Sequence, residues 1–377
     1  MPRIDTLPTP AALLDPTRMQ RNIERMQSRM NGLGVRLRPH VKTSKCVPVA
    51  QAQVQAGAHG ITVSTLKEAE QFFAAGFRDI LYAVGVVPNK FAQALDLRRR
   101  GCDLKLITDN ADMARAISAF GREHGHAFEV WLEVDTDGHR SGLAPESPQL
   151  LEVGRALVEG GSTLGGVMTH AGSSYDLDTP EALQAMAEQE RAGCVRAAQR
   201  LREQGWACPV VSVGSTPTAL SARELPGVTE VRAGVYVFFD LVMANVGVCS
   251  VDEVALSVLT TVIGHQPDKG WAIVDAGWMA MSRDVGTQRQ KRSYGYGQVC
   301  DLQGRPIEGC LMTGANQEHG IVSFTGAPDV DIASRLPVGT PLRILPNHAC
   351  ATGAQFPEYQ VLQSDGTVQP WTRFSGW

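Results

Sequence analysis

The stretch GITVSTLKEAEQFFAAGFRDILYAVGVVPNKFAQALDLRRRGCDLKLIT, residues 60–108, alternates short apolar runs with longer segments of helical periodicity. Its apolar runs have the length and content of buried strands, at residues 60–64, 80–84 and 104–108. The segments between them, 66–75 and 92–100, repeat apolar residues at helical spacing. Such alternation predicts parallel strands joined by crossover helices.

The same alternation continues on both sides of this stretch. Further helical segments lie at 17–30 and 181–204. The remaining strand candidates are residues 35–39, 128–135, 164–169, 210–214 and 228–232. Eight strand–helix units in roughly 200 residues predict an α/β fold, a closed (β/α)8 barrel of the TIM type. An open doubly wound sheet is the alternative.

The pattern changes after residue 245. Short β-rich runs separated by turn residues follow, at 255–264, 271–275, 321–324 and 341–345. We therefore expect the barrel to span residues 14–245 and a C-terminal antiparallel β domain to span residues 246–377. The N-terminal segment 1–13 is expected to join the β domain, because the strand that ends at residue 14 is not needed in the barrel.

Composition limits the class of protein. Of 377 residues, 43% are apolar, which is enough for a large buried core. The 35 basic and 39 acidic residues nearly balance without a basic stripe, so nucleic acid is not an expected partner. No apolar run reaches the roughly 18 residues of a membrane span, and the first residues do not resemble a signal peptide. We expect a cytoplasmic protein whose eight cysteines are free thiols.

Polar residues follow several predicted strands, at the end where a parallel barrel carries its functional groups. The seventh strand runs into Gly214-Ser215-Thr216, and the eighth runs into Gly234-Val235-Tyr236. Glycine amides and hydroxyl groups at these two strand ends often bind a phosphate. The alternative is an ordinary turn followed by a Ser or Thr N-cap.

Lys42 follows the first predicted strand, in the run RPHVKTSK of residues 38–45. A lysine in a barrel mouth can be desolvated enough to become a neutral amine, the nucleophile that forms an imine with an aldehyde. An inward lysine together with a phosphate site indicates pyridoxal 5′-phosphate (PLP). The alternative is a surface lysine, an interpretation that suits Lys45 better.

His348 and Cys350 stand two residues apart near the C-terminus. On an extended segment, such a pair points both side chains to one face. Imidazole and thiolate together favour zinc over magnesium or calcium, and two protein ligands leave positions open for water and substrate. The alternative is that Cys350 is a buried structural thiol.

Seven motifs occur together over nearly the whole chain. They are RPHVKTSK (38–45), DGHR (137–140), THAG (169–172), GST (214–216), RAGVY (232–236), QEHG (317–320) and HAC (348–350). In this combination the chain resembles the D-serine dehydratase/D-threonine aldolase family. These are fold type III PLP enzymes related to alanine racemase, so the resemblance implies an alanine racemase-like barrel followed by a β domain.

The resemblance implies roles for the residues around the cofactor. Lys42 would bind PLP as an imine. His170 would lie beside the cofactor ring, and Arg140 would lie near its phenolic oxygen and the substrate. The other cofactor contacts implied are Tyr175, Gly214, Ser215, Thr216, Gly234 and Tyr236.

The resemblance also implies a metal centre. His348 and Cys350 match the metal ligands, which usually bind zinc in the dehydratases; manganese, cobalt and magnesium are alternatives. Gln317 and His319 are expected near the metal or the substrate, and the alternative is that they only satisfy backbone groups.

The implied activity is that of a PLP- and metal-dependent lyase, a dehydratase that removes water from a small β-hydroxy D-amino acid. D-threo-3-hydroxyaspartate would give oxaloacetate and ammonia, and D-serine would give pyruvate and ammonia. Aldolases of the family often carry aspartate in place of Cys350 and GGGTG in place of residues 213–218, so both departures favour a dehydratase. The alternatives are a D-threonine aldolase, which releases glycine and an aldehyde, and a non-catalytic PLP carrier. By analogy with its fold type, a homodimer is expected.

Overall fold

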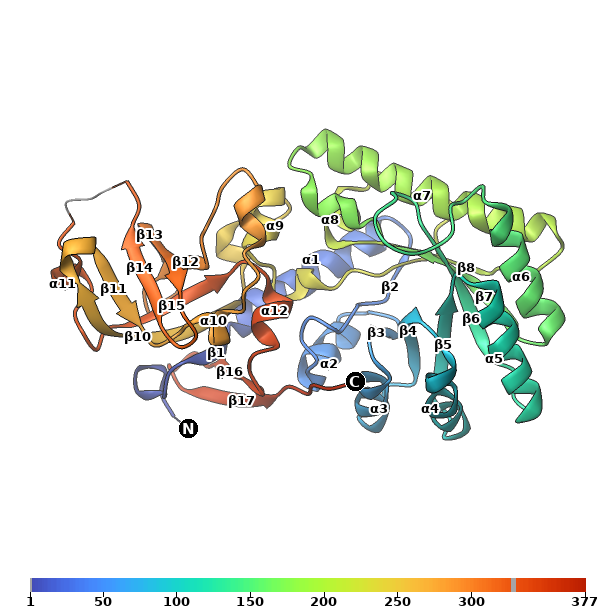
Figure 1. The fold of residues 1–377 in the computed structure, drawn as a ribbon, viewed down its shortest axis with the longest axis horizontal. Helices are drawn as coiled ribbons and strands as arrows, with labels where there is room; N and C mark the ends of the chain where they lie inside the picture. Colours follow the sequence, from blue (N-terminus) through green and yellow to red (C-terminus); the bar gives the residue numbers. More distant parts are fainter. Residues whose placement is uncertain (1, 327–329) are drawn as a thin grey trace. The chain divides into compact units, whose positions relative to one another are not determined.

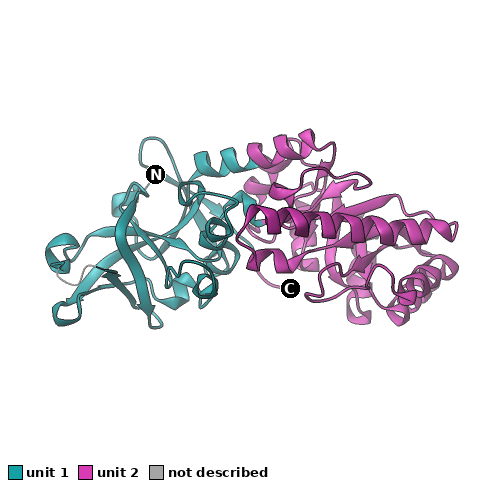
Figure 2. Cartoon of the chain, turned by 90° about the horizontal axis from the view of Figure 1, so that it is seen from above, with its two compact units in different colours: residues 1–23, 235–374 teal, residues 24–234, 375–377 magenta. Residues whose placement is uncertain are grey.

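The computed structural model describes residues 2–326 and 330–377. Residues 1 and 327–329, which fall within the predicted β domain, lie outside the described residues. The chain forms two compact units (Figure 2). The barrel unit comprises residues 24–234 and 375–377, and the β unit comprises residues 1–23 and 235–374. The domain limits drawn from the sequence, at residues 13/14 and 245/246, stay a prediction.

The barrel unit is built on an eight-stranded parallel sheet with the order β2-β9-β8-β7-β6-β5-β4-β3 (Figure 1). A parallel bridge between His40 and Thr62 joins the two ends of this order, so the strands form a ring. The predicted (β/α)8 barrel is confirmed, with a strand at each expected place. The strands are β2 (Arg36–Leu37), β3 (Ile61–Val63), β4 (Asp79–Gly85), β5 (Asp103–Thr108), β6 (Glu129–Val134), β7 (Thr163–Thr169), β8 (Val210–Val213) and β9 (Glu230–Val231).

Helices connect the strands, and polar caps mark where several of them begin. Thr65 accepts a hydrogen bond from the Glu68 amide at the start of α3, and Asn110 and Thr179 cap α5 and α7 in the same way. The helices are α1 (Pro16–Gly32), α2 (Val47–Gln55), α3 (Leu66–Ala74), α4 (Pro88–Arg99), α5 (Ala111–Glu123), α6 (Pro148–Gly160), α7 (Pro180–Glu203) and α8 (Thr216–Ser221).

The β unit contains a nine-stranded sheet with the order β11-β14-β13-β12-β15-β10-β1-β16-β17. An additional β10–β11 pairing closes six of these strands into a barrel. Strand β1 pairs with β10 and β16, so the N-terminal strand joins this sheet as expected. The strands are β1 (Ala11–Leu14), β10 (Leu256–Gln266), β11 (Trp271–Val274), β12 (Gly297–Cys300), β13 (Pro306–Ala315), β14 (Gly320–Phe324), β15 (Pro341–Pro346), β16 (Glu358–Leu362) and β17 (Val368–Thr372).

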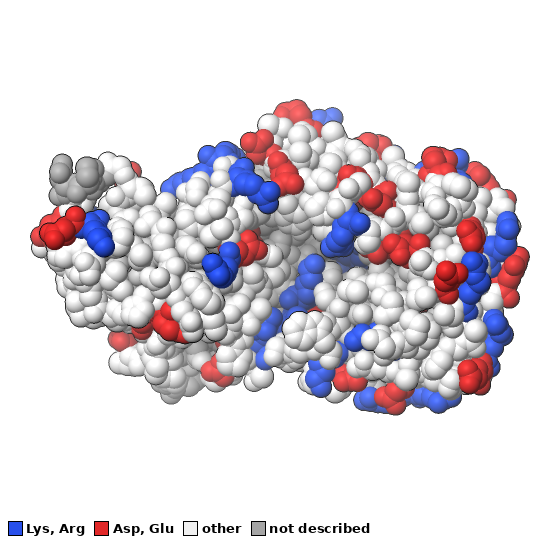
Figure 3. All heavy atoms as spheres, viewed as in Figure 1, with Lys and Arg blue, Asp and Glu red and all other residues white. Residues whose placement is uncertain are grey.

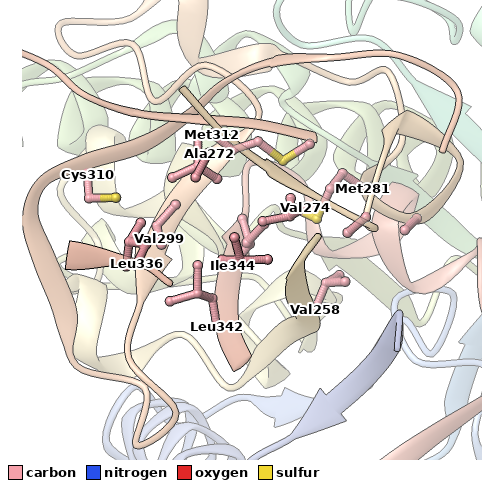
Figure 4. Packing of buried hydrophobic residues seen from close by; sticks show 14 of the residues in the cluster. Val258, Ala272, Val274, Met281, Val299, Cys310, Met312, Leu336, Leu342 and Ile344 are labelled. Atoms are coloured by element: carbon pink, nitrogen blue, oxygen red, sulfur yellow. The ribbon is translucent and has the colours of Figure 1, made fainter. Parts of the chain in front are cut away.

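The core of the β unit lies inside this small barrel (Figure 4). Val258 and Val262 on β10, and Leu342 and Ile344 on β15, are buried in it at the spacing of one strand face. Short helices lie in the connections, at α9 (Leu241–Val246), α10 (Trp278–Met281), α11 (Ile332–Arg335) and α12 (Ala349–Gly353). With four to six residues each, they are too short to produce helical periodicity in the sequence.

Acidic and basic side chains are interspersed over the face seen in Figure 3. Within the described part of the chain, none of the helices combines the length and apolar character needed to cross a membrane.

Candidate cofactor site and metal centre

Lys42 lies just beyond the C-terminal end of β2, in a turn that leads into α2. The backbone just before Lys42 is hydrogen-bonded to the segments of both neighbouring strands, β9 and β3. The His40 amide donates to the Ala233 carbonyl at 2.9 Å, and the Val41 amide donates to the Thr62 carbonyl at 2.9 Å. The Lys42 side chain is half-buried. The structure therefore places this lysine at the barrel end that the sequence predicted.

His170 follows β7, and its Nδ1 atom lies 3.2 Å from the Gly214 carbonyl oxygen. A carbonyl only accepts, so Nδ1 carries the hydrogen and Nε2 is left as an acceptor. Burial and the nearby Lys42 charge lower the pKa of His170 to about 3. The Tyr175 ring lies 6.0 Å from the His170 ring, centroid to centroid. His170 is thus a neutral imidazole that shares the barrel mouth with Lys42.

Gly214 and Ser215 shape the loop after β8. Gly214 has φ +126°, and a Cβ there would lie 2.9 Å from Val231 Cγ1, so both backbone and space require glycine. Ser215 is the N-cap of α8 and forms a capping box with Thr218. Its hydroxyl also lies 2.8 Å from that of Ser174. The N-cap interpretation is therefore correct for Ser215, while phosphate binding by Gly214, Ser215 and Thr216 stays a prediction.

Gly234 ends the barrel unit. A Cβ on this residue would lie 2.9 Å from the His40 carbonyl oxygen and 3.2 Å from His40 Cβ. Glycine thus allows the segments after β9 and β2 to approach each other closely. Tyr236 belongs to the β unit and is fully buried there.

Arg140 lies on the loop after β6 and is exposed. Its Nη2 atom is 3.9 Å from Glu133 Oε1, and its charge contributes to the low pKa of His170. The structure therefore brings Arg140 near His170, as expected for a residue at the barrel mouth.

Two buried charged residues near the proposed site received no role from the sequence. Arg232, directly after β9, is buried, and it donates to the Ser212 hydroxyl at 2.8 Å and to the Thr169 carbonyl at 2.6 Å. Glu190, in the middle of α7, accepts through one oxygen from the Ala171 and Gly214 amides, at 2.9 and 3.1 Å. It lies on the apolar face of α7, a position that is a detectable signal for a buried acid.

The described residues fit an anionic aromatic cofactor at the barrel mouth. His40 Nδ1 is buried there without a hydrogen-bond partner, a costly arrangement that a bound group could relieve. Burial, together with the charges of Lys42 and Arg232, lowers the pKa of His40 well below its usual value. Cationic groups beside a close glycine approach suit a phosphate-bearing ligand.

His348 and Cys350 lie together in the β unit, but the predicted extended segment is wrong. Only His348 is extended, with φ −134° and ψ 105°, and Cys350 lies in the first turn of α12. The helix begins here because the Ala349 amide donates to the buried Asp240 carboxylate at 2.9 Å. The His348 and Cys350 side chains nevertheless form a hydrogen bond, so the predicted juxtaposition of imidazole and thiol is present.

A carboxylate completes the surroundings of His348. Asp284 Oδ2 lies 2.6 Å from His348 Nδ1. Burial opposes the His348 charge, but Asp284 and Cys350 outweigh it and raise the pKa of His348 to about 11. Among the described residues, no three His, Cys, Asp or Glu side chains gather to hold a metal ion. A metal on His348 and Cys350 would therefore keep open positions, as catalytic sites require.

Gln317 and His319 lie exposed on the loop between β13 and β14. The Gln317 side chain donates to Glu318 Oε1 at 3.4 Å, and the His319 carbonyl accepts from the Asn316 amide at 2.8 Å. Their contact with metal or substrate stays a prediction.

Comparison with known proteins covers both units. The alanine racemase N-terminal domain matches residues 14–242, and a serine dehydratase domain matches residues 255–362. A D-threo-3-hydroxyaspartate dehydratase from Delftia sp. (strain HT23) is 72% identical over 99% of this chain and 98% of its own. Its solved structure superposes with a TM-score of 0.99 at 71% identity, with both chains fully covered.

Two more distant relatives also match along the whole chain. A D-serine dehydratase from Dictyostelium discoideum is 29% identical over 97% of this chain and 96% of its own. A D-threonine aldolase from Arthrobacter sp. is 30% identical over 97% of this chain and 91% of its own. The chain therefore belongs to the D-serine dehydratase/D-threonine aldolase family of alanine racemase-like, fold type III PLP enzymes.

Proposed function

We propose that this protein is a PLP- and divalent-metal-dependent lyase that removes water from β-hydroxy D-amino acids. D-threo-3-hydroxyaspartate is the preferred substrate and gives oxaloacetate and ammonia; D-serine gives pyruvate and ammonia. The observation that carries this proposal is the 72% identity to a D-threo-3-hydroxyaspartate dehydratase over nearly the whole of both chains. The pairing of His348 with Cys350 supports it.

Lys42 is the group that holds PLP and then moves a proton. Its amine would hold the cofactor through the aldehyde, and as a free amine at the barrel mouth it would be placed to remove the α-proton of the substrate. PLP, when bound, supplies the electron sink for the resulting negative charge. The half-buried position of Lys42, next to the neutral His170 imidazole, supports this assignment.

The neighbouring residues orient the cofactor and substrate. His170 would pack against the cofactor ring, with Tyr175 on the same strand-end loop, and Arg140 would bind anionic oxygens at the mouth. The phosphate would be held by Gly214, Ser215, Thr216, Gly234 and Tyr236. Glycine is required at Gly214 by close packing on Val231 and Arg232 and at Gly234 by close packing on His40, which supports two tightly packed loops at this end of the barrel.

His348 and Cys350 hold the divalent metal, which we propose to be zinc because imidazole and thiolate favour it. Hydroxide is a poor leaving group, and a metal supplies the Lewis acidity that its departure needs. Gln317 and His319 contact the substrate. A cytoplasmic location and a homodimer are part of the same proposal.

The nearest alternative is a D-threonine aldolase, which the 30% identical relative brings into consideration. Cys350 favours dehydration, because aspartate is common at this position in the aldolases. A non-catalytic PLP carrier would not need a β unit with an imidazole–thiol pair.

One assay distinguishes a dehydratase from an aldolase and from a PLP carrier. The holoenzyme is incubated with D-serine, D-threonine and D-threo-3-hydroxyaspartate, with and without chelator, and keto acid, ammonia and glycine are measured. We expect oxaloacetate and ammonia from D-threo-3-hydroxyaspartate, lost on chelation and restored by zinc. Glycine and acetaldehyde from D-threonine, without 2-oxobutyrate, would instead identify an aldolase. Release of neither set of products would identify a carrier.

A further inference from the structure

The backbone around His348 is fixed from both sides by buried groups of the β unit. Asp240 accepts from the Ala349 amide at 2.9 Å and from the Met243 amide at 3.0 Å. On the other side, the Asn347 amide group donates to the Gly295 carbonyl at 2.7 Å and accepts from the Thr287 hydroxyl at 3.0 Å. The peptides next to the metal ligands are therefore set before a metal arrives.

The remaining freedom at His348 is rotation of its ring. The side chain is 41% exposed, so packing alone does not fix the ring. The hydrogen bond of 2.6 Å from Nδ1 to Asp284 Oδ2 does fix it. It also keeps a hydrogen on Nδ1, so Nε2 is the nitrogen that would give up its proton and bind a metal shared with Cys350. Metal-binding histidines commonly donate their second nitrogen to a carboxylate for this reason.

Asp284 is itself held in place by its own loop. Its Oδ1 atom accepts from the Gly286 amide at 3.0 Å, and its own amide donates to the Ser282 hydroxyl at 3.2 Å. Ser282 adopts φ +69° and ψ 167°, a backbone conformation that costs energy in a residue other than glycine. One Asp284 carboxylate oxygen therefore accepts a hydrogen bond within its own loop, and the other faces His348.

We propose that Asp284 is a positioning residue that orients the His348 imidazole for metal binding. It does so through the hydrogen bond to Nδ1 and is not a metal ligand itself. The absence of a three-residue cluster of metal-binding side chains in the described part of the chain agrees with this division of roles. The inference rests on the proposed function, in which His348 and Cys350 hold a divalent metal.

The test uses metal-stripped, PLP-loaded enzyme titrated with Co²⁺, whose bond to thiolate gives a charge-transfer absorption. Competition with a chelator gives the dissociation constant. The variants are Asp284→Ala and Asp284→Asn, with Cys350→Ala as the reference for loss of a ligand. Asp301→Ala is the matched control, because Asp301 lies in the same unit and pairs with Arg305 at 2.7 Å instead.

We expect Asp284→Ala to bind one Co²⁺ with its thiolate absorption, at an affinity about 10–100-fold lower than that of the wild type. Asp284→Asn should recover most of this loss, because its amide oxygen still accepts from Nδ1. Asp301→Ala should match the wild type, and the PLP absorbance should be the same in all variants of either aspartate.

Three results would overturn the inference. Wild-type Co²⁺ affinity in Asp284→Ala would show that Asp284 does not position His348. An Asp284→Asn variant with no better Co²⁺ affinity than Asp284→Ala would show that the hydrogen bond to Nδ1 is not the cause of the effect. A loss in Asp284→Ala as complete as in Cys350→Ala would make Asp284 a ligand. Failure of the proposed metal centre is distinguishable, since wild-type enzyme would then bind no Co²⁺, or Cys350→Ala would bind it unchanged.

Discussion

The Nδ1 atom of His170 lies 3.2 Å from the carbonyl oxygen of Gly214, while the amide of Gly214 donates to Glu190 at 3.1 Å. The same Glu190 oxygen accepts from the Ala171 amide at 2.9 Å. One residue of the loop after β8 is thereby joined to both the imidazole and the backbone of the segment after β7. The proposed phosphate loop and the proposed ring contact are thus positioned as one unit.

Gly214→Ala should weaken PLP binding more than it weakens the fold. The added Cβ would lie 2.9 Å from Val231 Cγ1, and φ +126° disfavours alanine, so the loop that accepts the His170 hydrogen bond must shift. PLP affinity of the apoenzyme, measured by absorbance titration, is expected to fall at least tenfold, which corresponds to about 1.4 kcal/mol.

Gly205→Ala is the matched control for this change. Gly205 also has a positive φ, +78°, but a Cβ there would meet no atom within 4 Å. It should lose stability through its backbone alone and keep wild-type PLP affinity. Equal PLP affinities in the two variants would contradict the role given to the loop.

Glu190→Ala should destabilise the protein and lower PLP affinity together. Removal of the carboxylate leaves the Ala171 and Gly214 amides buried without their acceptor, at a cost of about 1–3 kcal/mol for each. The free energy of urea unfolding of the apoenzyme and the PLP dissociation constant are the two measurements. Glu188→Ala, on the exposed side of the same helix and paired with Arg191, should change neither. An unchanged PLP affinity in Glu190→Ala would contradict the coupling.

The sequence predicted the parts of this fold that depend on local patterns. Each barrel strand is a short apolar run. Strand β1 could be assigned to the β unit because eight other apolar runs already accounted for the barrel strands. The residues at the strand ends, Lys42 and His170 among them, followed from the rule that parallel barrels work at one end.

Other parts of the site depend on contacts between distant residues. Asp284 is 64 residues from His348 in sequence, and nothing in its own segment marks it as a partner of that imidazole. An i, i+2 pair points to one face on an extended segment, which is the conformation predicted for His348 and Cys350. The acceptor that starts the helix is Asp240, which is 109 residues from Ala349.

Lys42→Ala should abolish both activity and the visible absorbance of lysine-bound PLP. The other lysine in the segment after β2 is Lys45, and its amine is paired with the buried Glu68 carboxylate at 2.9 Å. Lys45→Ala is therefore the control, expected to keep the absorbance. The readouts are a spectrum of the purified enzyme and keto acid release from D-threo-3-hydroxyaspartate. Retention of both in Lys42→Ala would refute its assignment.

The unfolding free energy of the apoenzyme should depend on pH through His170. Its folded pKa is lowered to about 3 by burial and the Lys42 charge, whereas an unfolded histidine titrates near pH 6.5. Between these values the unfolded chain holds a proton that the folded chain lacks, so stability falls as pH decreases below about 6.5.

His170→Asn should remove this dependence, which amounts to about 1.4 kcal/mol per pH unit for one proton. Burial raises the pKa of Glu133 and Glu190, so these carboxyls act in the opposite direction, and only the difference between variant and wild type isolates the imidazole. Urea unfolding of both apoproteins between about pH 5 and 6.5 measures it. The wild type should lose more stability toward acid than the variant does. Parallel curves would show that folded and unfolded His170 bind the proton equally, so its pKa would not be lowered and its neutral role beside the cofactor would lose its support.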